Sequence, residues 1–397
     1  MKVLMVTPYL PCPESSGGQT RSFNLLKHLS SECEVTLFSF LLPDQKKTDQ
    51  KKLKKYCQKI VLFNRGKTWQ PRKIVFTGFS PYPFLVANYF SWTMKEAIKE
   101  ELAKNDYDLV HVECFYLMPN IPKTSVPVFL VDQTIEFAVY QHFVETLSSK
   151  LTWIKPLLWI DVLKLKFWEA RFWKQTDYLV AVSDQDKKLM EKISQRKVTV
   201  VPNGVSDSLL KSRSLKKYSQ PTVLFGVANF KWMQNKEGAV NLLKNIWPEI
   251  HQKMPSAKLL IAGRHSEDFI SSLELSDKEM KNVEVAEVNK PEEAYSKSWV
   301  LVAPMKSGGG SRTKFFEAMA CRLPIVTTPE GIEGIEAQNN QEVIVGPIKN
   351  LAKLSVKLMK DKNKMEKIGQ KAHQLVSQKY SWEKSAQTLL KVYQSAY

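Results

Sequence analysis

The sequence lacks the features that mark several common classes of protein. Its five cysteines are scattered and form no CxxC pair, which argues against a disulfide framework and a zinc site and favours a reducing compartment. No apolar run reaches the roughly 18–20 residues of a membrane span. The opening MKVLMVTPYLPCPE has no small-residue cleavage site and predicts a first buried strand rather than a signal peptide. GxGxxG, Walker, HExxH and GxSxG motifs are absent too, which excludes the most familiar dinucleotide, NTPase, zinc-protease and hydrolase signatures.

Acidic residues are scarce relative to basic ones. The 397 residues include 58 Lys and Arg but only 40 Asp and Glu, for a net charge of +18. Much of the excess is local, because Lys46–Lys73 holds eleven basic residues and one acidic residue, Asp49. Such a patch suits a phosphate-rich partner, either anionic lipid, nucleic acid or a phosphorylated substrate. A solvated basic helix face is the alternative interpretation.

The alternation of short β-branched runs with helical periodicity predicts an α/β protein with parallel sheets. The length predicts two domains. The strands expected in the first half are Val3–Thr7, Glu34–Ser39, Ile60–Phe63, Leu109–Val112, Val126–Val131, Tyr178–Val182 and Val198–Val201. Those expected in the second half are Val223–Val227, Lys258–Ala262, Val283–Val285, Trp299–Ala303, Pro324–Thr327 and Val343–Val345.

The turn sequence Pro202-Asn203-Gly204 and the polar stretch after it separate the two series of strands. We therefore expect an N-terminal domain over residues 1–205, a linker over 206–220, a C-terminal domain over 221–378, and a closing helix within 379–397 that packs back on the N-terminal domain. Ligands of open α/β sheets lie beyond the carboxyl ends of the strands, so the predicted site is a cleft between two facing domains.

The most informative segment is Ser307–Glu317, SGGGSRTKFFE. Its three glycines, Gly308, Gly309 and Gly310, allow the backbone to approach a ligand, and Ser311 and the residues after it have helical periodicity. A helix start favours an anion, and Arg312 and Lys314 add positive charge. With Glu317 placed to bind hydroxyl groups, the pattern predicts a diphosphate flanked by a sugar. A glycine-rich turn with surface charges is the alternative.

A second glycine turn lies in Pro13–Arg21, where Gly17 and Gly18 precede a helix. It fits neither a dinucleotide nor a P-loop signature, and a structural role is equally compatible with it. Asp184-Gln185-Asp186 resembles a metal-binding pair, but Ser183 before it predicts a capped helix start, which we favour.

Polar residues also end two predicted strands of the first half. His111 and Glu113 form the sequence HVE, and Glu136 ends QTIE, so both groups are candidates for catalysis or hydroxyl binding. A satisfied histidine at a domain edge is the alternative for His111. Trp153–Trp173 holds four tryptophans among lysines, and we favour a helix packed on its own domain over one lying in a membrane interface.

Together these segments resemble glycosyltransferase family 4, whose members are retaining enzymes of the two-domain GT-B architecture. The resemblance covers nearly the whole chain and includes a subgroup feature, the GGGxRxK loop. The segments that carry it are PxxSGGxxRxxNLLxxL from Pro13, Val180–Asp186, Val200–Val205, Leu224–Ile250, Leu260–Arg264, Ser307–Gly334 and Ser381–Tyr393.

The resemblance implies a site and a mechanism. The C-terminal domain would bind a nucleotide-diphosphate sugar, Glu317 would hold the ribose, and Gly17 and Gly18 would lie near the phosphates. The family uses neither a metal nor another cofactor, and the leaving diphosphate is thought to assist deprotonation of the acceptor. Arg312 would then stabilise the charge that grows on this diphosphate.

The sequence departs from the family pattern at three places. Gly309 replaces a common glutamate, which points to Arg312 and Lys314 as phosphate-binding residues. The usual Arg and Lys at the start of the second domain are matched only loosely, by Lys231 and Lys236.

The third departure is Gln133, which stands where many members have a histidine, so that His111 and Glu136 are the candidates for the N-terminal catalytic contribution.

The expected function is sugar transfer to a glycan or lipid-linked acceptor in cell-envelope or exopolysaccharide synthesis. The location expected is the cytoplasm, including the inner membrane face through Lys46–Lys73. Two alternatives remain: a non-catalytic GT-B module that binds nucleotide, and a basic nucleic-acid-binding protein. The latter has no recognition motif in this sequence, so no nucleic acid is expected as a partner.

Overall fold

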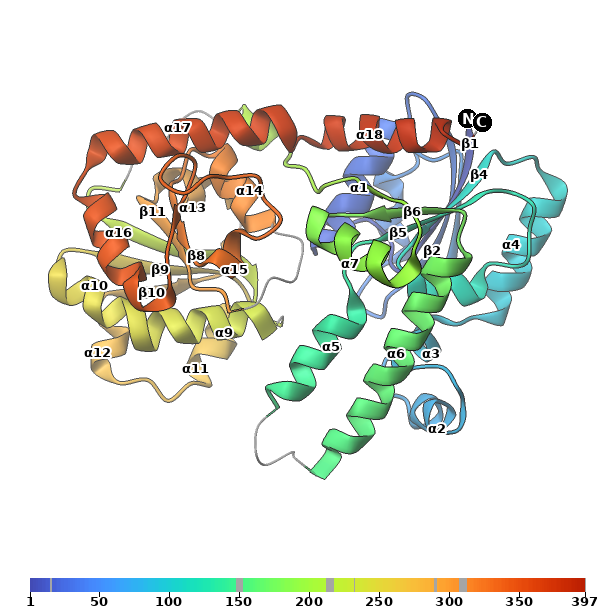
Figure 1. The fold of residues 1–397 in the computed structure, drawn as a ribbon, viewed down its shortest axis with the longest axis horizontal. Coiled ribbons are helices and arrows are strands. Elements are labelled where there is room, and N and C mark those ends of the chain that lie inside the picture. Colours follow the sequence, from blue (N-terminus) through green and yellow to red (C-terminus); the bar gives the residue numbers. More distant parts are fainter. Residues whose placement is uncertain are drawn as a thin grey trace. The chain divides into compact units, whose positions relative to one another are not determined.

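The structure, a computed structural model, describes residues 1–14, 16–147, 153–211, 218–231, 233–288, 291–306 and 313–396. It divides into two compact units. Unit 1 comprises Met1–Pro202 and Ser385–Tyr397, and unit 2 comprises Asn203–Lys384. Each unit is an α/β sandwich with its own parallel sheet (Figure 1). None of the described helices is both long enough and apolar enough to cross a membrane.

Unit 1 is built on a seven-stranded sheet with the order β3-β2-β1-β4-β5-β6-β7, in which neighbouring strands run parallel. Its strands are β1 (Lys2–Thr7), β2 (Glu34–Leu41), β3 (Lys59–Asn64), β4 (Leu109–Glu113), β5 (Val128–Asp132), β6 (Tyr178–Ala181) and β7 (Val198–Val200). Both faces of this sheet are covered, and accordingly the central strands are apolar runs without alternation.

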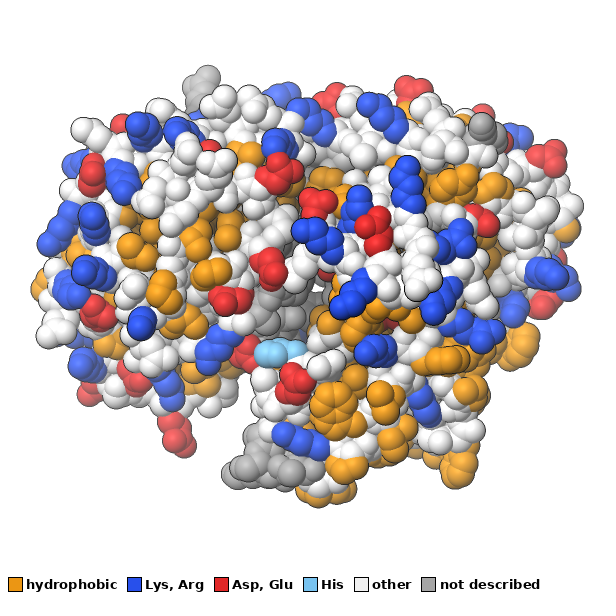
Figure 2. Space-filling view, in the orientation of Figure 1, with side chains coloured by type: hydrophobic (Ala, Val, Ile, Leu, Met, Phe, Trp, Pro, Cys, Tyr) orange, Lys and Arg blue, Asp and Glu red, His pale blue; other side chains and the backbone are white. Residues whose placement is uncertain are grey.

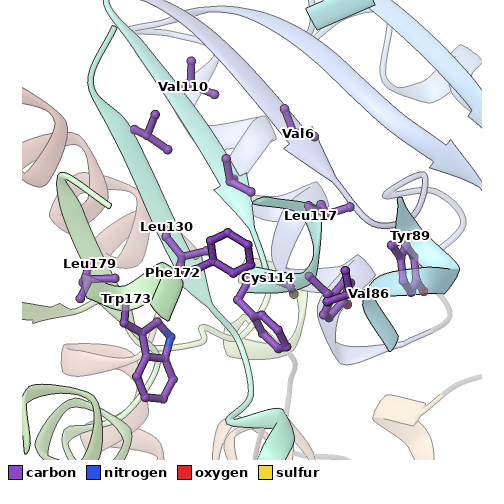
Figure 3. Close-up of a cluster of buried hydrophobic side chains, with 14 of the residues drawn as sticks. Val6, Val86, Tyr89, Val110, Cys114, Leu117, Leu130, Phe172, Trp173 and Leu179 are labelled. Atoms are coloured by element: carbon purple, nitrogen blue, oxygen red, sulfur yellow. The ribbon is translucent and has the colours of Figure 1, made fainter. Parts of the chain in front are cut away.

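The helices of unit 1 cover both faces of its sheet. They are α1 (Gly17–Leu29), η1 (Lys47–Lys52), α2 (Pro71–Phe79), α3 (Phe84–Tyr89), α4 (Trp92–Lys104), η2 (Phe115–Asn120), α5 (Glu136–Glu145), α6 (Lys155–Gln175), α7 (Asp184–Ser194) and, from Ser385 on, α18 (Trp382–Gln394). On one face, Val110 and Leu130 of the sheet pack with Phe172 and Trp173 of α6 (Figure 3). On the other face, Leu389 of α18 belongs to the same buried cluster as the strands.

Unit 2 has a six-stranded parallel sheet with the order β10-β9-β8-β11-β12-β13. Its strands are β8 (Thr222–Asn229), β9 (Lys258–Arg264), β10 (Val283–Ala286), β11 (Val300–Ala303), β12 (Ile325–Thr327) and β13 (Ile344–Val345). Its helices are α8 (Asp207–Leu210), α9 (Met233–Asn241), η4 (Leu242–Ile246), α10 (Trp247–Lys253), α11 (Ser266–Ser271), α12 (Asp277–Met280), α13 (Pro291–Lys297), α14 (Thr313–Ala320), α15 (Pro329–Ile332), η5 (Ile348–Asn350), α16 (Leu351–Met359) and α17 (Lys362–Lys379).

Each of the predicted strands is present, with ends shifted by one or two residues or, at β8, extended to Asn229. At the predicted cap, the Ser183 hydroxyl accepts a hydrogen bond from the backbone N–H of Asp186, so the structural interpretation of the two aspartates is confirmed. The predicted linker 206–220 begins with α8, and its residues 212–217 lie outside the described part.

The basic stretch Lys46–Lys73 differs from the helix face considered as an alternative. It contains η1, β3 and the start of α2, and the turns and loops between them carry further basic residues, so its charges do not lie on one helix. That alternative is wrong because β-branched and aromatic residues in the middle of the stretch pair with β2 as a sheet strand.

Candidate functional site

In unit 2, a hydrogen-bonded chain of groups holds the side chain of Glu317. This residue lies on α14, which follows β11 in the sequence. Its Oε2 accepts a hydrogen bond from the hydroxyl of Tyr295, 3.0 Å away. Tyr295 is fully buried on α13, and its oxygen accepts a hydrogen bond from the backbone N–H of Val227 at 3.0 Å. The carboxylate is therefore tied through a rigid aromatic side chain to the central strand β8.

The electrostatics of this pair suit a hydroxyl-binding group. Burial raises the pKa of Glu317 to about 7, although the hydrogen bond from Tyr295 opposes the shift. Burial and the nearby charge of Glu317 raise the pKa of Tyr295 well above its usual value. Tyr295 consequently remains a proton donor at neutral pH, while Glu317 exchanges its proton near neutrality.

Lys314 lies one turn before Glu317 on α14 and is held against α9. Its Nζ donates a hydrogen bond to Oδ1 of Asn235 at 3.0 Å and lies 5.1 Å from the ring centre of Phe225. Asn235 is fixed in turn, since its Nδ2 donates to the carbonyl oxygen of Asn229 at 3.0 Å. One side of α14 thus carries a positioned ammonium group and a positioned carboxyl group.

The other predicted donor residues of unit 2 fall into two groups. Lys231 is exposed just after β8, and Lys236 on α9 places its Nζ 5.5 Å from the ring centre of Phe269. Neither of these lysines is seen to bond to Glu317 or Lys314 within the described residues. The loop residues predicted to bind phosphate, Gly308, Gly309, Gly310, Ser311 and Arg312, lie outside the described part.

In unit 1, the two glycines of the Pro13–Arg21 segment, Gly17 and Gly18, stand at the start of α1. Gly17 is the first residue of the helix, and Ser16 caps it by accepting a hydrogen bond from the backbone N–H of Gln19. A Cβ on Gly18 would lie 1.7 Å from the Tyr9 hydroxyl and 2.6 Å from Oε1 of Gln133. Glycine is therefore required at position 18 by the close approach of two polar side chains.

Gln133 is the centre of a buried polar network at the carboxyl ends of β4 and β5. Its Oε1 accepts a hydrogen bond from the Tyr9 hydroxyl at 3.3 Å, and its Nε2 donates to Oε2 of Glu113. The same carboxylate oxygen accepts a hydrogen bond from the Ser22 hydroxyl of α1. Burial lowers the pKa of Arg21, and the charge of Glu113 opposes this shift.

His111, predicted as a catalytic residue, is fully buried in unit 1. Its Nδ1 hydrogen-bonds with the hydroxyl of Tyr393 on α18 at 2.5 Å, and its Nε2 lies 3.5 Å from Oε1 of Glu113. Its Nδ1 is bonded as the structural alternative expects, but Nε2 and the Glu113 oxygen that faces it are buried without a hydrogen-bond partner among the described residues. The imidazole is therefore only half satisfied.

Glu136, the other predicted catalytic residue of unit 1, is the first residue of α5 and is half-buried. Burial and the charge of Asp132 raise its pKa to about 8. Asp132 itself accepts hydrogen bonds from the backbone of Phe115 and from the indole of Trp173, and burial raises its pKa to about 7. Glu136 is therefore mostly protonated at neutral pH and donates rather than accepts a proton.

The described residues contain no cluster of three or more His, Cys, Asp or Glu side chains that is arranged to hold a metal ion. This finding covers the aspartates of α7 and the carboxyl groups around Asp132.

Comparisons with known proteins agree with this geometry. Residues 15–209 match the family described as Glycosyltransferase Family 4, and residues 220–361 match Glycosyl transferases group 1. The two matches together support a glycosyltransferase of this type. Its two Rossmann-like domains have the GT-B fold, as the resemblance implied.

Solved structures of other GT-B proteins align over the whole chain. A sucrose-phosphate synthase from Thermosynechococcus elongatus has a TM-score of 0.69 at 16% identity and covers 100% of this chain and 99% of its own. A glycosyltransferase from Rickettsia africae has a TM-score of 0.66 at 15% identity, with coverage of 100% and 98%. Anabaena Alr3699/HepE in complex with UDP and glucose has a TM-score of 0.65 at 12% identity, with coverage of 100% of both chains.

One sequence relative is an uncharacterized 44.6 kDa protein of the cps region of Klebsiella pneumoniae. It is 25% identical over 175 residues. The match spans 43% of this GT-B chain and 45% of the relative, less than half of either.

Several residues that shape the two sites were missed in the sequence. Tyr295 precedes Glu317 by 22 residues, and nothing in its local sequence predicts that it reaches β8 and α14 together. Ser22 and Gln133 both donate a hydrogen bond to Glu113, but the three residues come from three distant segments of unit 1, and none of these segments predicts the contact by itself. The available hint was that Glu113 and Gln133 both stand at the carboxyl ends of parallel strands.

Proposed function

We propose that this chain transfers a sugar from a nucleotide-diphosphate sugar to a glycan or lipid-linked acceptor, with retention of the anomeric configuration. The observation that carries the proposal is the fixed carboxyl group of Glu317, which accepts a hydrogen bond from Tyr295. Glu317 lies on the same helix, α14, as Lys314, whose ammonium group is also held in place. A carboxylate that accepts hydrogen bonds suits the two hydroxyl groups of a ribose. An ammonium group one turn away suits the neighbouring diphosphate.

The reaction that we propose is driven by electrostatic stabilisation. Negative charge grows on the leaving diphosphate, and Lys314 together with Arg312 and the glycines before it supplies the compensating positive charge and backbone donors. In this proposal unit 1 provides the acceptor side, and the donor phosphates are assigned to Gly17 and Gly18 because a helix start favours an anion. The transfer that we propose requires neither a metal ion nor another cofactor.

The biological setting of the proposal is synthesis of a cell-envelope polysaccharide or an exopolysaccharide at the cytoplasmic face of the membrane. The Klebsiella relative supports it, because it is described as lying in a cps region. The HepE structures are described as complexes with UDP, glucose or UDP-glucose, and one structure of Staphylococcus aureus TarM as a complex with UDP. These ligands make UDP the first nucleotide to test.

The decisive experiment is a calorimetric titration of the full chain with UDP, GDP and ADP. It compares the wild type with Glu317→Ala and with a control, Glu366→Gln, at an exposed glutamate of α17. We expect one nucleotide to bind the wild type and the control, and Glu317→Ala to weaken that binding about tenfold or more. Equal binding by Glu317→Ala would overturn the site assignment.

Turnover then separates a transferase from a module that only binds nucleotide. The chosen nucleotide is offered as a set of its sugar conjugates, and release of nucleoside diphosphate is followed with and without a membrane extract as a source of acceptor. A protein that binds nucleotide tightly but releases none from any conjugate would be a binding module, and the proposed reaction would be wrong.

A further inference from the structure

Helix α6 leaves one of its apolar faces uncovered. Trp153 lies two residues before the helix, and Leu157, Ile160, Leu163 and Phe167 follow on it at spacings of three and four residues, so the five side chains line one stripe. All five are exposed, Trp153 to 79% and Leu157 to 67%. At 1.5 Å per residue the stripe is about 21 Å long.

The opposite face of α6 is already used by the core. Leu165, Phe172 and Trp173 belong to a buried cluster with the sheet strands of unit 1, and Val162 is buried as well. A helix that is apolar on all sides is normally buried on all sides. The exposed stripe is therefore surplus to the packing of unit 1, and it indicates that a second apolar environment covers α6.

Helix α2 continues this apolar surface. Ile74, Val75, Phe76 and Phe79 are exposed on it, Phe79 to 93%, and Trp69 just before it is exposed to 77%. Such a density of exposed large apolar side chains on nine helical residues exceeds the scattered ones that monomeric proteins tolerate.

Contacts between side chain and backbone hold the end of α2 against α6. The Nζ of Lys164 donates to the carbonyl oxygens of Thr77 and Ser80, at 2.7 and 2.8 Å. The indole of Trp168 donates to the carbonyl oxygen of Pro81 at 2.9 Å. We call the exposed apolar side chains of α2 and α6, with Trp69 and Trp153, the docking face; Figure 2 shows apolar side chains gathered over these two helices.

Basic residues outnumber acidic ones in the segments that carry the docking face. Residues 65–81 contain four basic residues and no acidic one. Residues 153–175 contain five basic residues, whereas the two acidic ones turn inward. Glu169 is fully buried and accepts hydrogen bonds from the start of α5, and Asp161 accepts one from the backbone N–H of Phe84.

We propose that the docking face binds the surface of an anionic lipid bilayer. Helices with large apolar residues on one side and lysines beside them lie in the headgroup region, and tryptophan is the residue most favoured at that depth. The excess of lysine and arginine complements anionic headgroups, whereas a second copy of this chain would bring the same positive charges together. The proposal goes beyond the transfer reaction and does not depend on it.

The test is co-sedimentation of the full chain with vesicles of about two parts phosphatidylcholine to one part phosphatidylglycerol, compared with phosphatidylcholine alone. The variant combines Leu157→Gln, Leu163→Gln and Phe79→Ser, all at exposed positions whose replacement leaves the core intact. The control is Tyr218→Ser, an exposed aromatic residue of unit 2. Unchanged thermal unfolding verifies that each variant is folded.

We expect the wild type and Tyr218→Ser to sediment with the anionic vesicles and to do so less with the neutral ones. The combined variant should bind the anionic vesicles at least about tenfold more weakly than the wild type. Glu317→Ala should bind vesicles as the wild type does, so a failure of the nucleotide site is distinguishable from a failure of docking. The proposal is overturned if the wild type ignores the vesicles or if the combined variant binds equally well. A wild-type dimer that the combined variant converts to monomer, without vesicle binding, would assign the face to self-association instead.

Discussion

The hydroxyl of Tyr295 donates a hydrogen bond to Glu317 and at the same time accepts one from the backbone N–H of Val227, each across 3.0 Å. A single buried oxygen therefore connects α13, α14 and β8. Because the phenol ring has only two rotatable bonds and is fully buried, the Glu317 carboxyl group is oriented by the core of unit 2.

Tyr295→Phe should weaken both the fold and the nucleotide site. The change leaves the Val227 N–H without its acceptor, which should lower the free energy of unfolding by about 1–3 kcal/mol. It also frees Glu317 to rotate, so nucleotide affinity should fall several-fold. Denaturant titration and calorimetry measure the two effects on one sample.

Tyr380→Phe is the matched control for this change. The Tyr380 hydroxyl accepts a hydrogen bond from the backbone N–H of Glu336 at 3.0 Å, and its ring stacks on that of Phe316. We expect a comparable loss of stability with unchanged nucleotide affinity. If both variants lost affinity equally, Tyr295 would have no role in positioning the carboxyl group.

Nucleotide affinity should depend on pH through Glu317. Burial raises the pKa of this residue to about 7, and the ionised form is the one that accepts hydrogen bonds from hydroxyl groups. Affinity should therefore be constant above about pH 8 and decrease as the pH falls through 7, approaching about a tenfold loss per pH unit. Calorimetric titrations above and below pH 7 measure this change in nucleotide affinity. Glu317→Gln should give a flat profile, in which the affinity no longer depends on pH.

The positions of the strands were predictable because each central strand is a short run of β-branched and apolar residues bounded by polar turns. The run Leu109–Val112 became β4 (Leu109–Glu113), and Val223–Val227 became the first part of β8 (Thr222–Asn229). Side-chain partners were less predictable, because hydrogen bonds between distant elements depend on packing. His111 meets Tyr393 across 282 positions, and only the return of α18 to unit 1 brings them together.

The sequence predicted a helix at Trp153–Trp173 but not which of its sides is covered. Its tryptophans stand among lysines, and packing on its own domain was favoured over a position in a membrane interface. The face with Val162 and Leu165 is buried as that prediction expects, whereas the stripe with Leu157 and Leu163 is exposed, because the sequence does not show which neighbours are available to cover it.

Gly18→Ala should disturb the polar network of unit 1. The new Cβ would meet the Tyr9 hydroxyl and Oε1 of Gln133, so one of these side chains must move and the hydrogen bond between them is lost. We expect sugar-transfer turnover to fall at least tenfold, about 1.4 kcal/mol in the barrier, with a loss of stability of about 1–2 kcal/mol.

The control for this substitution is Gly78→Ala on α2, where no atom lies within 4 Å of the added Cβ. Alanine in place of glycine within a helix should raise the stability by about 0.5–1 kcal/mol and leave turnover unchanged. Wild-type turnover in Gly18→Ala would show that the arrangement of Tyr9 and Gln133 is unnecessary for the reaction.

Stability should decrease as the pH rises through neutrality. Burial raises the pKa of Asp132 to about 7 and, with the charge of Asp132, that of Glu136 to about 8. Between their unfolded and folded pKa values the folded state binds more protons, so the free energy of unfolding falls as these protons are lost between about pH 5 and 8. Chemical denaturation over this range should show the slope.

Glu136→Gln should reduce that slope, because an amide at this position has no proton to lose. Since Glu136 is half-buried and partly screened by water, the gain in stability at pH 8 should be about 1 kcal/mol. A slope equal to that of the wild type would exclude Glu136 as one of the groups responsible.

The variant Tyr393→Phe distinguishes a structural role of His111 from a catalytic one. Tyr393→Phe removes the partner of a fully buried imidazole, and the free energy of unfolding should drop by about 1–3 kcal/mol. The hydrogen bond joins β4 to α18 inside the core of unit 1 and is made by neither Glu317, Gly18 nor Gln133. Turnover per folded molecule should therefore stay within about twofold of the wild type, measured at a temperature where both proteins are fully folded. If turnover fell about a hundredfold without a matching loss of stability, the imidazole would take part in proton transfer, and the catalytic prediction for His111 would stand.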